Sequence, residues 1–532
     1  MKALKSLGRF GPFALISALF VLFAALSALW SLWMILPAVI LGTLMAMGIY
    51  DLIQTKHSIL RNYPVLGHMR FFFEGIRPEI RQYLIESDQD EEPFSRDDRS
   101  LVYQRAKGVE DARPFGTRMR VYDAGYSWVT HSVQPVHITD TDFRVTIGNK
   151  DCKQPYDASI YNISAMSFGS LSANAISALN KGAKMGRFAH DTGEGGISRY
   201  HREGGGDLIY EIGSGYFGCR TENGQFDPDK FKEQAASDQI KMIELKLSQG
   251  AKPGHGGMLP ASKISAEIAA ARGIPMGHDC ISPAAHSAFT SPVQMMEFLG
   301  KLRDLSGGKP VGFKLCIGHQ REFMCMVKAM LETGIVPDFI VVDGAAPLEF
   351  ANHVGMPMVE GLTFVHNTLR GAGIRDQVKL GAAGKVVSAF DIARALALGA
   401  DWCNSARGFM FAVGCIQAQA CHTNQCPVGV ATQDPTRQRA LDVDDKSQRV
   451  ARFHHNTLMA LGEMAGAAGL ESPSNFLPRH MMMRQSDNSM VQGDQVYGYL
   501  PEGYLLDDQS PDYNGNKTRW ARAQADSFVP FD

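Results

Sequence analysis

The amino-acid sequence predicts an α/β protein built on a (β/α)8 TIM barrel, preceded by a two-helix transmembrane hairpin and an irregular lead-in. From Tyr161 onward, short apolar strands alternate with Ala-rich helical stretches, the pattern of βα units and a parallel sheet. Eight strands can be counted, over about 250 residues, the usual size of this barrel. The turn after the first strand, "AMSFGSLS", lacks the spaced glycines of an open dinucleotide-binding sheet. The sequence therefore favours a closed barrel.

The N-terminal segment, residues 1–52, is expected to form the transmembrane hairpin. The stretch from Phe10 to Tyr50 contains no charged residue or histidine, and one bilayer span needs about 20 such residues. Trp30 and Trp33 mark a central turn at the far interface, and basic residues flank both ends. The barrel is therefore expected on the cytoplasmic side of the inner membrane. A cleaved signal peptide is the alternative, but its apolar core spans only about 7 to 15 residues.

The rest of the chain divides by pattern. Residues 53–155 are expected to form a lead-in that packs on the barrel, because they combine a charge run at 87–100 with few periodic segments. Residues 156–430 are expected to form the barrel, with an excursion at 210–240 that reads as a hairpin plus a helix. Residues 431–532 are expected to form a helix near 446–468 and a polar tail. The expected strands begin at Tyr161, Arg187, Lys241, Ile274, Lys309, Asp338, Val378 and Asp401.

Composition limits the kind of partner. The chain of 532 residues is 45% hydrophobic with a formal net charge of -2, which favours a globular enzyme and gives no general attraction to nucleic acid. Its nine cysteines are too sparse for a disulfide scaffold, and three of them lie within twelve residues. Such spacing points to metal or cluster ligation in a reducing compartment. A homo-oligomer is left open.

Polar and glycine-rich residues gather where the strands should end, which is the catalytic face of a TIM barrel. The runs at 191–196 and 248–260 are too glycine-rich for regular structure, so their backbone can approach a ligand closely. His255 and His286 also fall on this face, where a hydrogen-bonded structural histidine is the expected role. The strand-end residues are Met166, Ser167, Thr192, Gly193, Glu194, Lys246, Gln249, Lys252, Lys314 and Asp343.

The seventh and eighth units carry the signal for a phosphate site. Helix N-termini bind phosphate through free backbone N–H groups, and TIM barrels often use these two loops for it. Each loop alone would be a plain turn more often than not, but together they fit a phosphorylated cofactor such as FMN. The loops are "LGAAGKV", with Gly381 and Gly384, and "NSARGFM", with Ser405, Arg407 and Gly408.

Cys415, Cys421 and Cys426 form a C-x5-C-x4-C run followed by Pro427. Thiolates hold iron–sulfur clusters, and a proline after the last cysteine recurs in ferredoxin-type sites. Three ligands suit a three-iron cluster, whereas a four-iron cluster with an outside ligand, or zinc completed by His422, is left open by the spacing. Three buried core thiols fit the polar sequence poorly. The other six cysteines are expected to be buried thiols.

The motifs "SAMSFGSLS", "DTGEGG", "GSGYFG", "KLSQGAKPGHGGMLP" and "GCIQAQACHTNQCPVGVATQDP" resemble the FMN-binding synthase domain of glutamate synthases over about residues 160–470. The resemblance implies FMN at the catalytic face and a [3Fe-4S] cluster on Cys415, Cys421 and Cys426. It also implies hydride transfer to 2-iminoglutarate, formed from 2-oxoglutarate and ammonia, to give L-glutamate. Glu194 matches the acidic residue beside the iminoglutarate site. Lys314 and Gln249 match polar groups around flavin and substrate.

The chain also departs from that family. It begins "MKALKSLG", without the N-terminal cysteine of a glutaminase domain, so ammonia or a partner-supplied amine is the expected nitrogen source. The loop "VVDGAAPLEF" after the sixth strand and the segment "LCIGHQREF" after Lys314 differ from the family pattern, which bears on substrate identity. No strand–GxGxxG–helix unit for NAD(P)H appears. The electron donor is therefore expected to be a separate protein, ferredoxin or a diaphorase subunit, docking near residues 415–430.

Three functions follow from these residues. The first is a glutamate synthase-like oxidoreductase, the second a related flavin oxidoreductase acting on a different oxo acid or imine, and the third a membrane-bound electron-transfer subunit. Lys314 lies between apolar neighbours, so a buried ammonium stabilising flavin charge or a substrate carboxylate is expected. Glu194 is a candidate proton donor, with capping of backbone N–H groups as an equal alternative. Together with Gln249, these residues favour an enzyme.

Overall fold

The computed structural model describes residues 8–89, 92–112, 116–250, 256–344 and 353–529. The chain divides into two compact units, Met1–Asp90 and Glu91–Asp532. The boundary therefore falls later than residue 52, because residues 53–90 belong with the hairpin and only the remainder of the lead-in belongs with the barrel.

The N-terminal unit is helical. Two segments of 22 residues, Gly8–Leu29 and Leu32–Ile53, are long and apolar enough to cross a membrane. Their main helices pack closely, since a Cβ on Gly48 would lie 2.3 Å from the Phe13 ring. The buried Asp51 carboxylate accepts hydrogen bonds from Val65 N and His68 Nε2, both at 2.9 Å, which fixes the following chain. The helices are α2 (Gly11–Leu29), α3 (Ile35–Ile53), α4 (Ser58–Asn62) and α5 (Gly67–Ile80), with a π-helical turn at Arg81–Ile85.

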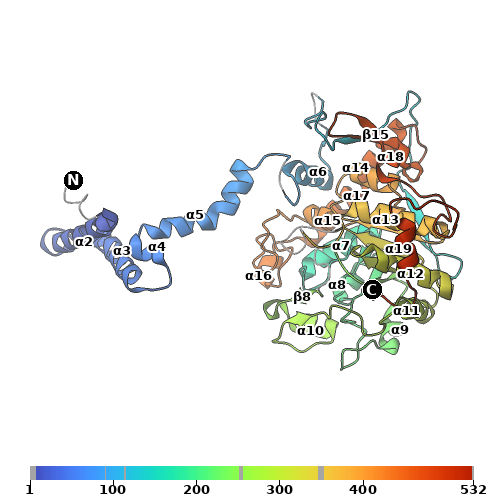
Figure 1. Ribbon diagram of the computed structural model, residues 1–532. Helices are drawn as coiled ribbons and strands as arrows, with labels where there is room; N and C mark the ends of the chain where they lie inside the picture. Colours follow the sequence, from blue (N-terminus) through green and yellow to red (C-terminus); the bar gives the residue numbers. More distant parts are fainter. Residues whose placement is uncertain (1–7, 90–91, 113–115, 251–255, 345–352, 530–532) are drawn as a thin grey trace. The chain divides into compact units, whose positions relative to one another are not determined.

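The second unit contains a closed barrel of eight parallel strands, which confirms the predicted fold class. Figure 1 labels many of the helices of this unit, among them α7, α12 and α17. The ring closes where β13 pairs with β4, with Cys403 opposite Tyr161. Apolar side chains fill both faces of these strands, as expected for a sheet buried on both sides. In ring order the strands are β4 (Tyr161–Ile163), β5 (His190–Asp191), β6 (Leu208–Ile212), β7 (Ile240–Lys246), β10 (Val311–Leu315), β11 (Phe339–Asp343), β12 (Lys379–Ala383) and β13 (Trp402–Ser405).

One predicted strand is wrong. The strand expected at Ile274 is not part of the barrel, because β9 (Cys280–Ile281) pairs antiparallel with β8 (Met258–Leu259) outside the ring. The missing barrel strand is β6, which overlaps the start of the segment expected to be an excursion at 210–240. Its charged Glu211 interrupts an apolar run, and that charge hides the strand from a search for continuous hydrophobicity. The long insertion lies instead between β7 and β10.

Helices and C-terminal segments cover the barrel. Long α17 packs on α7 and on α6, so the lead-in is held against the barrel. Strand β1 pairs with β14, which ties the lead-in to the expected polar tail. The helices are α6 (Arg96–Lys107), α7 (Ala173–Gly186), α8 (Arg199–Glu203), α9 (Pro228–Ala235), α10 (Ala266–Arg272), α11 (Pro292–Leu305), α12 (Gln320–Thr333), α13 (Met358–Gly371), α14 (Ala389–Ala397), α15 (Arg407–Ala412), α16 (Pro435–Gln438), α17 (Val443–Ala467), α18 (Gly493–Tyr497) and α19 (Asn516–Arg522). The outer strands are β1 (Ser127–Val129), β2 (Arg144–Ile147), β3 (Tyr156–Ser159), β14 (Met481–Arg484) and β15 (Met490–Gln492).

Candidate active site

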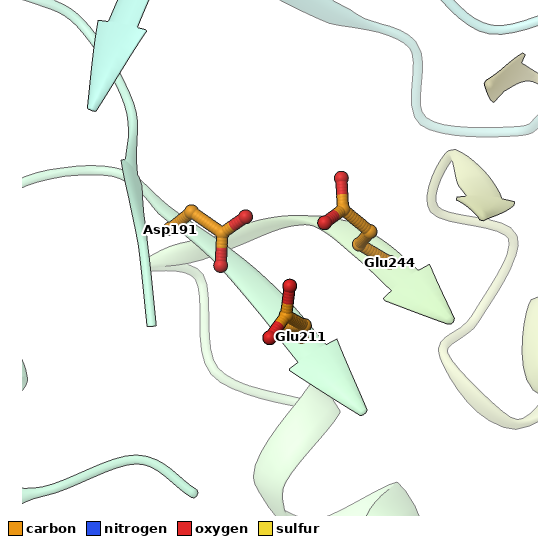
Figure 2. A group of neighbouring side chains, drawn as sticks. All are labelled: Asp191, Glu211 and Glu244. Atoms are coloured by element: carbon orange, nitrogen blue, oxygen red, sulfur yellow. The ribbon is translucent and has the colours of Figure 1, made fainter. Parts of the chain in front are cut away.

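Three carboxylates from neighbouring barrel strands face one another: Asp191 of β5, Glu211 of β6 and Glu244 of β7 (Figure 2). A ligand oxygen from each lies within 4.8 Å of the others, and all three side chains are buried. Lys314 of β10 completes the group, since its Nζ contacts Glu211 and lies 3.4 Å from Glu244 Oε1. The predicted functional lysine is therefore held by acids from two other strands.

Burial and the charges within this group determine which of its side chains are ionised. Burial raises the pKa of Asp191 to about 7, with the charge of Glu211 adding to the effect. Burial and the charge of Asp191 raise the pKa of Glu244 well above its usual range. Burial also opposes ionisation of Glu211, but Lys314 and Lys246 outweigh it and lower that pKa. Burial likewise opposes the charge on Lys314, yet Glu211 and Glu244 raise its pKa well above normal. The group thus holds a Lys314–Glu211 ion pair beside protonated acid.

A second polar group surrounds Glu194, just beyond β5. Lys246 Nζ lies 3.3 Å from Glu194 Oε2 and 2.9 Å from Gln249 Oε1, so the lysine joins two predicted site residues. Ser282 Oγ donates to Glu194 at 3.4 Å. These contacts of Glu194 go to side chains rather than to backbone amides, so they are not those of a capping carboxylate. Lys246 also pairs in register with Lys314, which places the two polar groups side by side at the strand ends.

The first strand end forms a tight backbone junction with the second. Gly193 adopts φ +66°, and a Cβ there would lie 2.6 Å from Ser167 N, so only glycine fits. Ser167 Oγ accepts from Arg272 at 3.3 Å. Thr192 is fully buried, and its hydroxyl bridges β5 and β6 by donating to Gly193 O at 3.1 Å and accepting from Glu211 N at 3.1 Å. Thr192 therefore helps to hold β5 against β6. Met166, one residue before Ser167, is also buried.

The two predicted phosphate loops are neighbours, because β12 pairs with β13. Ser405 Oγ donates to Val386 O at 2.5 Å and joins them. No side chain caps the start of α15, which leaves the first amides around Arg407 and Gly408 without a side-chain acceptor. Gly381 has a packing role, since a Cβ there would lie 2.6 Å from the Trp402 ring. Gly384 adopts φ +147°, a backbone conformation that favours glycine over residues with a side chain.

The cysteine loop follows α15 and adopts an unusual backbone. Three non-glycine residues, Gln417, Gln419 and Asn424, have φ of 60°, 55° and 63°, a strained region that surrounding contacts must hold. Tyr103 OH donates to Cys415 O at 2.6 Å. Cys415 is half-buried, Cys421 exposed and Cys426 buried. Burial, with a smaller contribution from the other two thiols, raises the pKa of Cys415 to about 11, although the Gln417 amide and the charge of Arg407 act in the opposite direction.

Histidines near the site have structural roles where they are described. His286 Nε2 lies 2.7 Å from Lys246 O and Nδ1 lies 3.1 Å from Tyr216 OH, so both ring nitrogens are used. Burial lowers the pKa of His286 to about 4, which keeps the ring neutral. His255, Lys252 and the loop after β11 at 345–352 lie outside the described residues.

Sequence reasoning missed the acids that hold Lys314. Glu211 in "LIYEI" and Glu244 in "IKMIELK" are carboxylates inside otherwise apolar barrel strands. A charged residue in such a strand has to find a partner in the barrel interior, because burying it alone is costly. That signal was available for both residues. Lys263 and Arg272, which reach the site from the insertion, gave no comparable signal.

The raised pKa of Asp191 predicts a pH effect on stability. The unfolded value is 3.8 and the folded value about 7, so the folded state binds a proton that the unfolded state has lost between these pH values. The contribution of the Asp191 proton to the free energy of unfolding is fully present below pH 4 and is lost as the pH rises toward 7. Asp191→Asn keeps an acceptor for Gly193 N and removes this dependence. Relative to wild type, the variant should gain stability between pH 5 and 8, by at most about 4 kcal/mol.

Thermal unfolding midpoints of both proteins in detergent at several pH values measure this difference. Buried histidines with lowered pKa, such as His190 and His454, affect both proteins alike and cancel in the comparison. A constant difference between wild type and Asp191→Asn across this pH range would contradict a raised Asp191 pKa.

The chain matches a known protein family and is similar to several known proteins. A family model described as a conserved region in glutamate synthase matches residues 128–471. The chain is 39% identical over 490 residues to the glutamate synthase large subunit-like protein YerD of Bacillus subtilis, covering 83% of this chain and 93% of that protein. It is 34% identical over 317 residues to the archaeal glutamate synthase (NADPH) of Methanocaldococcus jannaschii, 58% of this chain and 59% of that enzyme.

Solved structures with a similar course of the chain are more distant. A mutant flavocytochrome b2 with pyruvate bound has a TM-score of 0.43 at 12% identity and covers 86% of this chain and 99% of its own. A mandelate oxidase with benzoyl-formic acid has a TM-score of 0.39 at 15% identity, covering 69% of this chain and 87% of its own. The length of the family match and the identity to YerD carry the assignment: the chain belongs to the glutamate synthase family of oxidoreductases.

Proposed function

We propose that this chain is an FMN- and iron–sulfur-dependent oxidoreductase that converts 2-oxoglutarate to glutamate with ammonia or a partner-supplied amine. The observation that carries the proposal is the Glu194–Lys246–Gln249 contact beside the buried Lys314, at the strand ends of a barrel from the glutamate synthase family. Carboxylate, amide and ammonium groups of this kind match an oxo acid and its imine. The archaeal relative, of which the chain spans 59%, is named as a glutamate synthase that uses NADPH.

The described residues fit FMN. Its phosphate would be held between the β12–α14 and β13–α15 loops, where the α15 amides lack a side-chain cap. Its ring would lie over the strand ends, where position 193 has no room for a side chain because Ser167 N is too close. Bound FMN would supply the hydride that reduces the imine carbon.

The chain's own residues would bind and orient the substrate. Lys246 neutralises Glu194 and, with Ser282, fixes its carboxylate, so that Glu194 can accept an N–H from the incoming ammonia or imine. The Lys314 ammonium, kept charged by Glu211, would hold negative charge on the flavin ring or a substrate carboxylate.

The cysteine loop fits an iron–sulfur cluster, which we propose to be [3Fe-4S]. A single zinc ion holds thiolates at about 2.3 Å, which places its sulfur ligands about 4 Å apart. Among the described residues, the ligand atoms of Asp191, Glu211 and Glu244 all lie within 4.8 Å of one another. The three cysteine sulfurs do not form such a group. The positive charge of Arg407, which acts on Cys415 and Cys421, supports an anionic centre. The electron donor would be ferredoxin or a diaphorase subunit, docking near the exposed Cys421.

The test is a reoxidation experiment with a panel of substrates. The purified protein is expected to be yellow-brown in detergent, with FMN and about three irons per chain. After anaerobic reduction, the flavin absorbance should return when 2-oxoglutarate and ammonium are added together and remain bleached with either alone. If the flavin absorbance returned faster with another oxo acid, that acid would be the substrate instead of 2-oxoglutarate. No return with any oxo acid would mark an electron-transfer subunit, and a colourless or zinc-containing protein would end the cofactor proposal.

We also propose that the N-terminal unit anchors the enzyme in the inner membrane, with the barrel on the cytoplasmic side. Large apolar side chains of α2 and α3, such as Val21 and Leu36, are exposed in the structure. In α5 and the turn after it, the apolar Phe72, Phe73 and Leu84 are also exposed. Lipid is the solvent that suits such surfaces.

Removal of residues 1–90 is therefore expected to give a soluble, still coloured protein. The cut follows the boundary between the two units, whereas a cut after residue 52 would separate Asp51 from its partners Val65 and His68. The measurement is ultracentrifugation of lysate without detergent, with flavin absorbance followed in supernatant and pellet. A truncated protein that stays in the membrane pellet would contradict anchoring by this unit.

A further inference from the structure

A buried lysine that has no carboxylate partner in the described part of the chain lies against the cysteine loop. Lys263, at the end of the short 3-10 helix Ala261–Lys263, is only 3% exposed. Its Nζ donates to Ser170 O at 3.0 Å, Cys421 O at 3.3 Å and Ala431 O at 3.4 Å. Among the described residues, no carboxylate pairs with it at salt-bridge distance. An ammonium buried with carbonyls alone is costly, which calls for a negative group close by.

The negative group is the cysteine centre. The Lys263 ammonium donates to the backbone of Cys421 itself, so its charge lies within the loop that carries the cysteines. Three thiolates holding iron and sulfide form an anionic centre, so a buried cation beside them supplies the missing counter charge. Arg407 also acts on the thiols of Cys415 and Cys421, but it is exposed to solvent, which screens its charge.

Lys263 also joins the cysteine loop to the loop after β4. Ser170 belongs to that loop, which contains the FMN candidate Ser167. Gln433 Nε2 donates to Gly169 O at 3.1 Å and to Leu171 O at 2.8 Å, so the two loops are bonded at several points. The insertion between β7 and β10 therefore brings a cation to the place where the flavin side and the cluster side meet.

We propose that Lys263 is the counterion of the cysteine centre, where its charge raises the reduction potential of the cluster and its three hydrogen bonds fix the cluster loop against the flavin-side loop. The proposal rests on the proposed iron–sulfur cluster. Charge and hydrogen bonding around the sulfurs are known controls of cluster potential. A nearby positive charge favours the reduced form, because reduction adds one negative charge to the centre.

Lys263→Gln is the main test, since it keeps a donor and removes the charge. In full-length protein in detergent, the variant should retain iron and show a cluster that is at least about tenfold harder to reduce, which is about 59 mV lower for one electron. The readouts are iron content, the electron paramagnetic resonance spectrum of the oxidised cluster and a redox titration. Lys263→Arg should keep a potential near that of wild type.

Lys309 provides a matched control. It is also buried and its Nζ donates to backbone carbonyls, Ala235 O at 2.6 Å and Ser237 O at 2.8 Å, but it precedes β10 and acts on no cysteine. Lys309→Gln should leave the cluster potential unchanged.

The outcomes separate this proposal from the one beneath it. A wild-type protein without iron would refute the cluster itself. A wild-type cluster with an unchanged potential in Lys263→Gln would overturn the role of Lys263. If Lys263→Gln loses its iron, a Lys263→Arg protein with a wild-type potential supports the counterion role, and loss of iron in both variants overturns it.

Discussion

Lys314→Met is expected to abolish turnover and to destabilise the barrel by about 3–5 kcal/mol, the cost of leaving buried charge without its partner. The Lys314 ammonium is the counterion of Glu211 and lies 3.4 Å from Glu244, and all three side chains are buried. Without the ammonium, Glu211 and Glu244 have to become protonated or be hydrated, and either change costs folding free energy. The measurements are the thermal unfolding midpoint and the rate of flavin reoxidation by 2-oxoglutarate with ammonium.

A double variant separates folding from chemistry. Lys314→Met with Glu211→Gln removes both members of the ion pair, so stability should return toward that of wild type while turnover stays absent. Breaking the buried Arg303–Asp338 pair, which lies 3.0 Å apart and also binds Val311 N, serves as a control. Arg303→Leu should lower stability but leave the reoxidation rate of the folded protein intact. Wild-type reoxidation by folded Lys314→Met protein would limit Lys314 to a structural role.

Cys421→Ser is expected to remove the cluster and all turnover with the physiological donor. Cys421 is the exposed member of the three cysteines, so the loss should follow from missing ligation rather than from a disturbed core. Chemically reduced variant should still be reoxidised by substrate, because the Glu194 and Lys314 groups do not involve this loop. Iron analysis and donor-driven turnover give the result.

Cys152→Ser is the matched control for that experiment. Cys152 is a half-buried cysteine outside the loop, and its Sγ donates to Gly308 O at 3.4 Å, a bond that serine can keep. This variant should retain iron and turnover. A Cys421→Ser protein that lost its iron yet accepted electrons from the donor at the wild-type rate would show that the cluster is not on the electron path.

The alternating apolar and helical pattern was enough to predict the barrel, because local hydrophobicity determines which segments can be buried strands. The pattern failed at β6, where Glu211 interrupts the apolar run, and at Ile274, where an apolar segment forms a two-residue strand outside the ring. The failure at β6 has a non-local cause: closure of the barrel brings Glu211 to Lys314, a residue more than one hundred positions away. No local pattern records that neutralisation.

The site was predictable in the same uneven way. Glycine-rich strand ends and cysteine spacing are local, so Glu194, Gln249 and the cysteine loop could be proposed from sequence. Lys314 was predicted to be functional, but its acidic partners were not predicted. Lys263 lies in a stretch with no pattern of its own, and only the folded insertion shows that its ammonium reaches Cys421 O.

The central claim is that this barrel makes glutamate, and a single-turnover experiment tests it most directly. Full-length protein in detergent is reduced anaerobically and mixed with 2-oxoglutarate and isotopically labelled ammonium, and the amino acid formed is identified by mass spectrometry. The expected result is about one labelled L-glutamate per flavin, formed in step with the return of flavin absorbance, with none from Lys314→Met. Flavin that stays reduced, with no labelled glutamate in a protein that contains both FMN and iron, would contradict the account.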